Sequence, residues 1–290
     1  MPAQSKWSLS TPQKVTFEEP VTALAVRIIG GTVNVVGDAT GPARLELSEI
    51  DGRPLTVTLD EGALTVAYDD LPWKNLTTWF SRKSWHRTAT VTLTVPTGTD
   101  VEVGVAGASA VVSNVTGRTA VRSVSGDVTL VGITGPVRAE TVSGLLEAQG
   151  IGGDLQFKSV SGDLTLVESS GGTVRADSIS GDVVVDLSPA VPGPSLVLGT
   201  VSGDVAIRLP NTVDAEVDAN TTSGALSCGF GELHVSSQFG AKKITGRLGA
   251  GRGSLKVTSV SGAVALLRRP ETDDWTQAGP TDSTPQGKVL

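Results

Sequence analysis

Aromatic residues and cysteine are scarce in this chain. Only 4% of its 290 residues are aromatic, and it has one cysteine, Cys228. A single cysteine excludes an internal disulfide and a thiolate metal cluster. Because aromatic side chains normally supply the bulk of a compact core, a chain that relies on Val, Ile, Leu and Ala is expected to have a narrow interior.

Long apolar runs and an excess of positive charge are absent as well. No stretch approaches the roughly 18 apolar residues of a membrane span, and the first residues lack the basic and then apolar regions of a secretory signal. The formal net charge is −7, so no nucleic-acid partner is expected. These observations predict a cytoplasmic protein, either free or peripheral at the membrane.

Glycine is abundant, and it recurs on a fixed period. Seven glycines follow one another at spacings of nine residues, with a single spacing of ten: Gly126, Gly135, Gly144, Gly153, Gly162, Gly172 and Gly181. The second and fourth positions after each glycine are apolar, and the position between them is polar in six of the seven units. This alternation is typical of a strand with one buried face. A third apolar position, two residues before the glycine, is predicted to turn inward.

The nine-residue units alternate between two kinds of corner. Ser/Thr-Val/Ile-Ser-Gly occurs at 123–126, 141–144, 159–162 and 178–181, whereas the units between them vary. The alternation predicts a β-solenoid whose coil has about 18 residues in two nine-residue halves, with one strand in each of two sheets. The serine before each glycine is expected to bond to the coil above or below it.

Three domains are predicted along the chain. Residues 1–95 lack the nine-residue period but contain expected strands at 24–29, 32–36, 43–47, 55–59, 63–68 and 89–95, and they are interpreted as an N-terminal β-rich cap. Residues 96–268 form the β-solenoid repeat domain. Residues 269–290, rich in Pro, Thr, Asp, Gln and Gly, are predicted to be a disordered tail.

The units Ser-Val-Ser-Gly-Asp-Val-Thr-Leu at 123–130 and Ser-Val-Ser-Gly-Asp-Leu-Thr-Leu at 159–166 resemble a known family. This is a bacterial family of glycine-rich β-strand repeat proteins, generally labelled "putative adhesin" and treated as a domain of unknown function. The resemblance covers 24–267. It implies an all-β, right-handed parallel β-helix-like fold, no known enzyme activity and no cofactor.

Aspartate often follows the repeat glycine, as at Asp127, Asp154, Asp163, Asp182 and Asp204. Calcium-binding β-rolls also use a nine-residue repeat, but they need a Gly-Gly-x-Gly-x-Asp turn in each unit. Here the corner typically has one glycine, so the aspartates are interpreted as turn residues in solvated corners. The two histidines, His86 and His234, have no metal-ligand neighbour at useful spacing. No catalytic, cofactor-binding or metal-binding residue is predicted.

One segment, 71–87, differs from the rest of the chain. It holds three of the five tryptophans and four basic residues, with no acid after Asp70. Tryptophan beside basic residues suits a membrane interface or an acidic partner. The candidate interaction surface consists of Trp73, Lys74, Trp79, Phe80, Arg82, Lys83, Trp85 and Arg87. Alternatively, these aromatic side chains fold back and plug the end of the solenoid.

The sequence favours a non-enzymatic, adhesin-like β-solenoid scaffold or binding protein, which could be associated with the cell envelope. Its partner would be an unidentified protein or a membrane surface. One alternative is a carbohydrate-acting β-helix enzyme, which would need clustered acids on one sheet, whereas the outward positions mix Thr, Arg, Glu and Gln. Another is a structural protein that self-associates, because solenoids with uncapped ends can stack.

Overall fold

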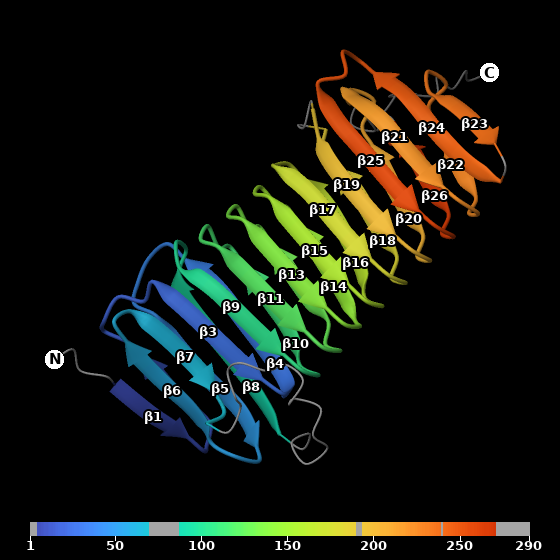
Figure 1. The fold of residues 1–290 in the computed structure, drawn as a ribbon. Helices are drawn as coiled ribbons and strands as arrows, with labels where there is room; N and C mark the ends of the chain where they lie inside the picture. Colours follow the sequence, from blue (N-terminus) through green and yellow to red (C-terminus); the bar gives the residue numbers. More distant parts are fainter. Residues whose placement is uncertain (1–4, 70–86, 190–192, 239, 271–290) are drawn as a thin grey trace, which may run out of the picture.

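The chain forms an elongated rod made of β-strands (Figure 1). The computed structural model describes residues 5–69, 87–189, 193–238 and 240–270, and these contain no helix. A membrane-crossing helix is accordingly absent from the described ranges. The described chain begins at one end of the rod and finishes at the other (Figure 1).

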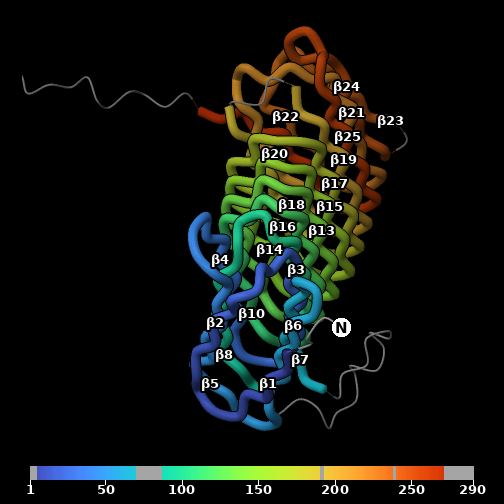
Figure 2. The backbone as a smooth tube through the Cα atoms, turned by 90° about the vertical axis from the view of Figure 1, so that its left-hand side faces the viewer, coloured from blue at the N-terminus to red at the C-terminus, as the bar shows by residue number. Residues whose placement is uncertain are grey.

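Two sheets run side by side along the rod (Figure 2). Among the described residues, sheet A has 14 strands and sheet B has 12. In spatial order, sheet A consists of β1 (Ser5–Leu9), β6 (Leu55–Asp60), β7 (Ala63–Ala67), β3 (Ala23–Ile28), β9 (Asp100–Val105), β11 (Thr119–Ser123), β13 (Val137–Thr141), β15 (Leu155–Ser159), β17 (Thr173–Ser178), β19 (Ser195–Thr200), β25 (Gly253–Ser259), β21 (Ala215–Thr221), β24 (Ala241–Leu248) and β23 (His234–Gln238). Sheet B consists of β2 (Gln13–Thr16), β5 (Arg44–Asp51), β8 (Thr88–Pro96), β4 (Gly30–Asp38), β10 (Ser109–Ser113), β12 (Val128–Val131), β14 (Leu145–Gln149), β16 (Asp163–Ser169), β18 (Val183–Leu187), β20 (Val205–Leu209), β26 (Val264–Arg268) and β22 (Leu226–Cys228).

In the middle of the rod the chain alternates between the sheets, and successive strands of one sheet pair in parallel. Thr119 pairs with Val137, and Val137 pairs with Leu155, each partner lying 18 positions further along. The extra residue before Gly172 makes the next step 19, from Leu155 to Val174. Paired strands lie about 4.8 Å apart.

The predicted alternation of buried and exposed positions is confirmed. Both apolar positions of every nine-residue unit are at most 3% exposed: Val128, Leu130, Val137, Ala139, Leu146, Ala148, Leu155, Phe157, Leu164, Leu166, Val174, Ala176, Val183 and Val185. These side chains form one continuous core between the sheets. A single coil could not cover its own apolar face, so the burial depends on its neighbours.

The third apolar position was predicted to point inward, and this is wrong at the serine corners. Val142, Val160 and Ile179 are 44%, 45% and 52% exposed, whereas Ile133 and Ile151 at the other corners are buried. At a serine corner, the side chain that points inward is that of the residue three positions before the glycine. In two such corners, Ser159 and Ser178 accept hydrogen bonds from the glycine N–H at 2.6 and 2.9 Å. Alternation then directs the next residue outward.

The serine that precedes each glycine forms the predicted ladder. The Ser125 hydroxyl donates to the carbonyl of Ala106, and that of Ser143 donates to the carbonyl of Val124. The same bond recurs from Ser180 to Val160 and from Ser202 to Ile179. Each coil is therefore bound to its neighbour through side chains as well as through the strands.

The corner glycines are required by close contact between backbones. A Cβ added to Gly181 would lie 2.0 Å from the carbonyl oxygen of Gly162 in the adjacent coil. That is far inside van der Waals contact, so any side chain would push the coils apart. Gly98, by contrast, lies in an exposed turn where an added Cβ would meet nothing within 4 Å.

Near the C-terminal end, the order of the coils in space differs from their order in the sequence. Strand β25 lies between β19 and β21, and β26 lies between β20 and β22. The serine ladder follows the same order, since Ser261 donates to the carbonyl of Val201 and Ser223 donates to that of Val260. The repeat at 259–262 is thus inserted between those at 200–203 and 221–224.

The strands expected within residues 24–95 are present, and they extend the same two sheets. Strands β3 and β4 pair in parallel with β9 and β10, so this segment is continuous with the repeats. The antiparallel strands β1 and β2 end the two sheets. Trp7 on β1 meets Phe17, just after β2, edge to face at 5.3 Å between ring centroids. This contact connects sheet A to sheet B at the N-terminal end.

A buried carboxylate fixes the last described residues. Asp186 on β18 is 5% exposed and binds the guanidinium groups of Arg208 and Arg269. Burial alone would raise the pKa of Asp186, but the two arginines outweigh it and lower the pKa below the ordinary value. The predicted tail therefore begins at a residue, Arg269, that is attached to the rod.

The corner contact predicts that Gly181→Ala destabilises the rod by about 1–3 kcal/mol or more, because the new methyl group must displace the adjacent backbone. The free energy of unfolding, measured by urea denaturation, tests this. Gly98→Ala is the matched control and should change it by less than about 0.5 kcal/mol. Equal effects of the two substitutions would contradict the stacking contact.

The Asp186 cluster predicts a pH-dependent difference between the native chain and Asp186→Asn. A lowered carboxyl pKa stabilises the fold above the unfolded pKa of 3.8, and the stabilisation is lost as the pH falls through the folded pKa. At pH 7 the variant should lose about 1.5–3 kcal/mol of unfolding free energy, and this difference should shrink below about pH 4. Asp177→Asn, which removes an exposed partner of Arg175, should cost at most about 1 kcal/mol. A pH-independent difference for Asp186→Asn would refute the account.

Candidate functional site

The aspartates after the repeat glycines have a structural role. Each accepts a hydrogen bond through Oδ1 from a backbone N–H of the adjacent coil, as Asp163 does from Asp182 at 2.8 Å. The other four aspartates accept in the same way. The backbone N–H of Leu145 donates to Asp127, that of Thr173 to Asp154, that of Asp204 to Asp182 and that of Ala263 to Asp204. In the described part of the chain, no group of three or more Asp, Glu, His or Cys side chains is placed to hold a metal ion.

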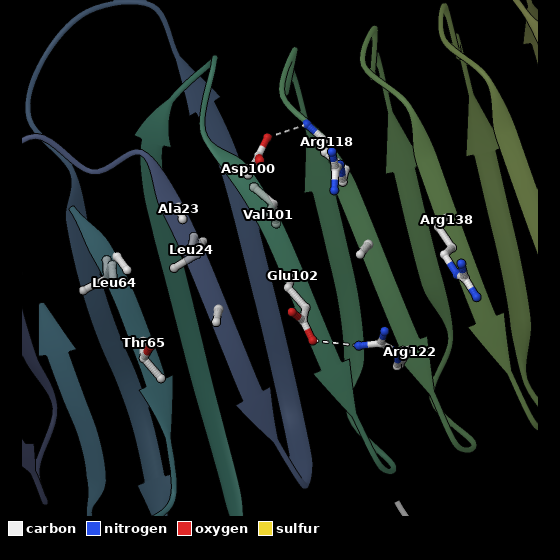
Figure 3. Close-up of a pocket in the computed structure, with 13 residues that line it drawn as sticks. Ala23, Leu24, Leu64, Thr65, Asp100, Val101, Glu102, Arg118, Arg122 and Arg138 are labelled. Atoms are coloured by element: carbon white, nitrogen blue, oxygen red, sulfur yellow. Dashed lines mark hydrogen bonds and ion pairs between the residues drawn. The ribbon is translucent and has the colours of Figure 1, made fainter. Parts of the chain in front are cut away.

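The outer face of sheet A carries a depression of about 510 Å³ (Figure 3). Its floor is made by alanines at outward positions, Ala23, Ala25, Ala63 and Ala120, which leave space beside longer side chains. The parallel register of β3 with β7 and β9 brings these positions together. The rim is charged and includes Glu102, Arg118, Arg122 and Arg138.

Ion pairs cross the strands beside this depression. The Glu102 Oε1 atom lies 2.7 Å from Arg122 Nη1 and 3.3 Å from Arg27 Nη2. The Glu140 carboxylate is 2.6 Å from Arg138 Nη2 and 3.4 Å from Arg122 Nε. One network, Arg27–Glu102–Arg122–Glu140–Arg138, thus extends from β3 to β13. The hydrogen bond from Arg138 lowers the pKa of Glu140, so its carboxylate stays ionised at neutral pH.

Arg118 connects this depression to a second one. Its backbone N–H donates to Asp100 at 2.9 Å (Figure 3), while its exposed guanidinium has no hydrogen-bond or ion-pair partner among the residues that the structure describes. Arg118 and Arg138 also line an adjacent depression of about 290 Å³, together with Asp154 and Arg175. Because two arginines are common to both, the depressions are adjacent, and together they are here called the sheet A groove, from β7 to β17.

Sheet B differs in its outward side chains. The row that crosses the middle of sheet B reads Thr92, Asn34, Val111, Thr129, Glu147, Thr165, Val184 and Ala206, with one charged residue. The equivalent row on sheet A includes Glu102, Arg138 and Arg175. The middle row of sheet A therefore carries more charged side chains than the middle row of sheet B.

A known domain family matches residues 48–267, which is most of the chain and includes the greater part of the groove. The chain belongs to the Toastrack DUF4097 family. This agrees with the sequence resemblance in one respect, since Toastrack DUF4097 is a domain of unknown function.

Other comparisons of this Toastrack chain add little. The crystal structure of a "putative cell adhesion protein" from Clostridium sporogenes ATCC 15579 aligns with 89% of this chain and all of that one, at 10% identity and a TM-score of 0.30. No curated protein matches the chain.

Seven of the eight residues predicted as an interaction surface lie outside the described part of this Toastrack domain. They are Trp73, Lys74, Trp79, Phe80, Arg82, Lys83 and Trp85. Arg87 is described; it is partly buried, and its guanidinium carbon lies 5.3 Å from the ring centroid of Tyr68, which is itself buried. Whether the remaining aromatic residues form a contact surface or a plug stays a prediction.

Sequence reasoning did not find the sheet A groove of this Toastrack domain. Its arginines are spread over positions 27 to 175 and come together only through strand register. One signal was available, because Arg138 and Arg175 occupy the outward position of units 37 residues apart, which is two coils. Dividing the aligned outward positions into alternate units, one set for each sheet, would have placed them on one face.

Proposed function

We propose that this Toastrack domain is a non-enzymatic, adhesin-like scaffold that binds its ligand through the sheet A groove. The observation that carries the proposal is an asymmetry of the rod: charged side chains gather around a groove on sheet A, whereas the middle row of sheet B has one charged residue. The corner bonds keep the coils in register, so the outward side chains are held on a rigid surface. Such a surface is suited to binding, because few side chains need to be ordered when the ligand arrives.

The state of two acids, Glu102 in the groove and Glu140 beside it, supports a non-enzymatic role. Hydrolysis of a glycoside needs a carboxylic acid whose pKa is raised so that it can donate a proton. Glu140 has the opposite property, since Arg138 lowers its pKa. Glu102 is paired with Arg122 and Arg27, so it acts as a counter-ion.

The finer description of the fold belongs to the same proposal. We interpret the domain as a solenoid with a coil of about 18 residues, on the basis of the pairing offsets of 18 and 19 positions, and as right-handed because the family resemblance implies that hand. The N-terminal β-strands act as a cap, supported by the Trp7–Phe17 contact that connects the two sheets. The segment 71–87 would provide a second contact, to an envelope protein or membrane surface.

Binding to a panel of polyanions tests the proposed function. The full chain would be immobilised and exposed to polygalacturonate, to vesicles containing phosphatidylglycerol, and to polyglutamate. We expect retention of at least one class, a loss of about tenfold or more in affinity for Arg118→Gln with Arg138→Gln, and no release of fragments.

Two outcomes would overturn this function. Retention of none of the three classes would remove the groove as a binding surface. Cleavage of polygalacturonate, detected as new reducing ends, would instead favour the alternative of a carbohydrate-acting enzyme.

A further inference from the structure

The sheet A groove is lined by cations and anions in alternation, which limits the ligands that it can accept. Glu102 lies between Arg27 and Arg122 in the network, and Asp154 lines the second depression with Arg118, Arg138 and Arg175. A ligand that presents only anionic acceptors, such as a DNA phosphate backbone, would be repelled by these acids at short range, whereas a ligand that also carries hydroxyl donors can bond to them. The groove-lining residues also include no aromatic ring on which a base could stack.

Several arginine donors in the groove remain available to a ligand. Arg118 has a guanidinium with no partner among the described residues. Arg138 binds Glu140 through Nε and Nη2, and Arg175 binds Asp177 through Nε. Since a guanidinium carries five N–H donors in a planar fork, both retain N–H groups that can bind a carboxylate.

The position of these arginines indicates an extended ligand that crosses the strands. Arg118 directly precedes β11, Arg138 is on β13, and Arg175 is on β17. Three strand steps at about 4.8 Å separate the first from the last, so contact with all three spans roughly 14 Å. The two depressions lie along this path and share Arg118 and Arg138.

An acidic peptide fits this face less well than an acidic glycan does. Peptides commonly bind sheets by adding a strand to an open edge, but β11 and β13 each already have a strand on both sides. A peptide lying across them would find no backbone partners. The hydroxyl groups of a glycan, by contrast, can donate to the acids of the groove while its carboxylates accept from the arginines.

We propose that the sheet A groove binds an acidic polysaccharide, with uronate carboxylates on Arg118, Arg138 and Arg175 and sugar hydroxyls on Asp154 and Glu102. This inference rests on the proposed function, whose binding surface it assigns to one ligand class.

Isothermal titration calorimetry of the full chain with polygalacturonate tests the proposal, with dextran as the neutral polymer and polyglutamate as the peptide polyanion. The test variant is Arg118→Gln with Arg138→Gln. The matched control is Lys14→Gln with Arg44→Gln, which changes the net charge equally on sheet B. We expect polygalacturonate to bind in a salt-dependent manner, dextran not to bind, the test variant to lose about tenfold or more in affinity, and the control to change less than about twofold.

Three results would overturn this assignment. They are no polygalacturonate binding by the native chain, equal loss in the two double variants, and polyglutamate binding as tight as that of polygalacturonate. The failures are distinguishable: if vesicles or polyglutamate bind in a manner that depends on Arg118 and Arg138, the proposed function stands and only the ligand class is wrong. Circular dichroism of both variants checks that the fold is retained.

Discussion

Direct contact between stacked backbones at the serine corners is the constraint on which the rest of the structure depends. An added Cβ at Gly181 would lie 2.0 Å from the carbonyl of Gly162, so the coils can approach only where that position is glycine. Around this contact, serine hydroxyls and aspartate carboxylates bond one coil to the next. The interior and the corners are thereby fixed, and variation is left to the outward positions of the two sheets.

Function in such a rod depends on what the outward positions carry. On sheet A, alanines at several of them create a depression, and arginines and acids surround it. The ion pairs from Arg27 to Arg138 hold the side chains in place. On sheet B the corresponding row has one charged residue, so the two faces differ in their outward chemistry.

The nine-residue pattern was sufficient to predict the two buried positions of each unit and the serine ladder, and local strand signals were sufficient for the strands within residues 24–95, although β1 and β2 were not expected. The sequence pattern did not predict features that depend on which strands pair in the folded chain. The insertion of β25 between β19 and β21 leaves no local signal, and the outward Val142 depends on which serine closes the turn. The groove was missed because its residues meet only through register, while the segment richest in tryptophan lies outside the described residues.

The central claim is that aspartate carboxylates bond one coil to the next at the corners where glycine backbones touch. Native-state amide hydrogen exchange tests this claim most directly. The N–H of Asp182 donates to Asp163 Oδ1 in the neighbouring coil. We expect this amide to be protected to about the same degree as the adjacent strand amides, and to exchange much faster in Asp163→Ala while distant coils are unchanged. Rapid exchange of the Asp182 amide in the native chain would contradict the account.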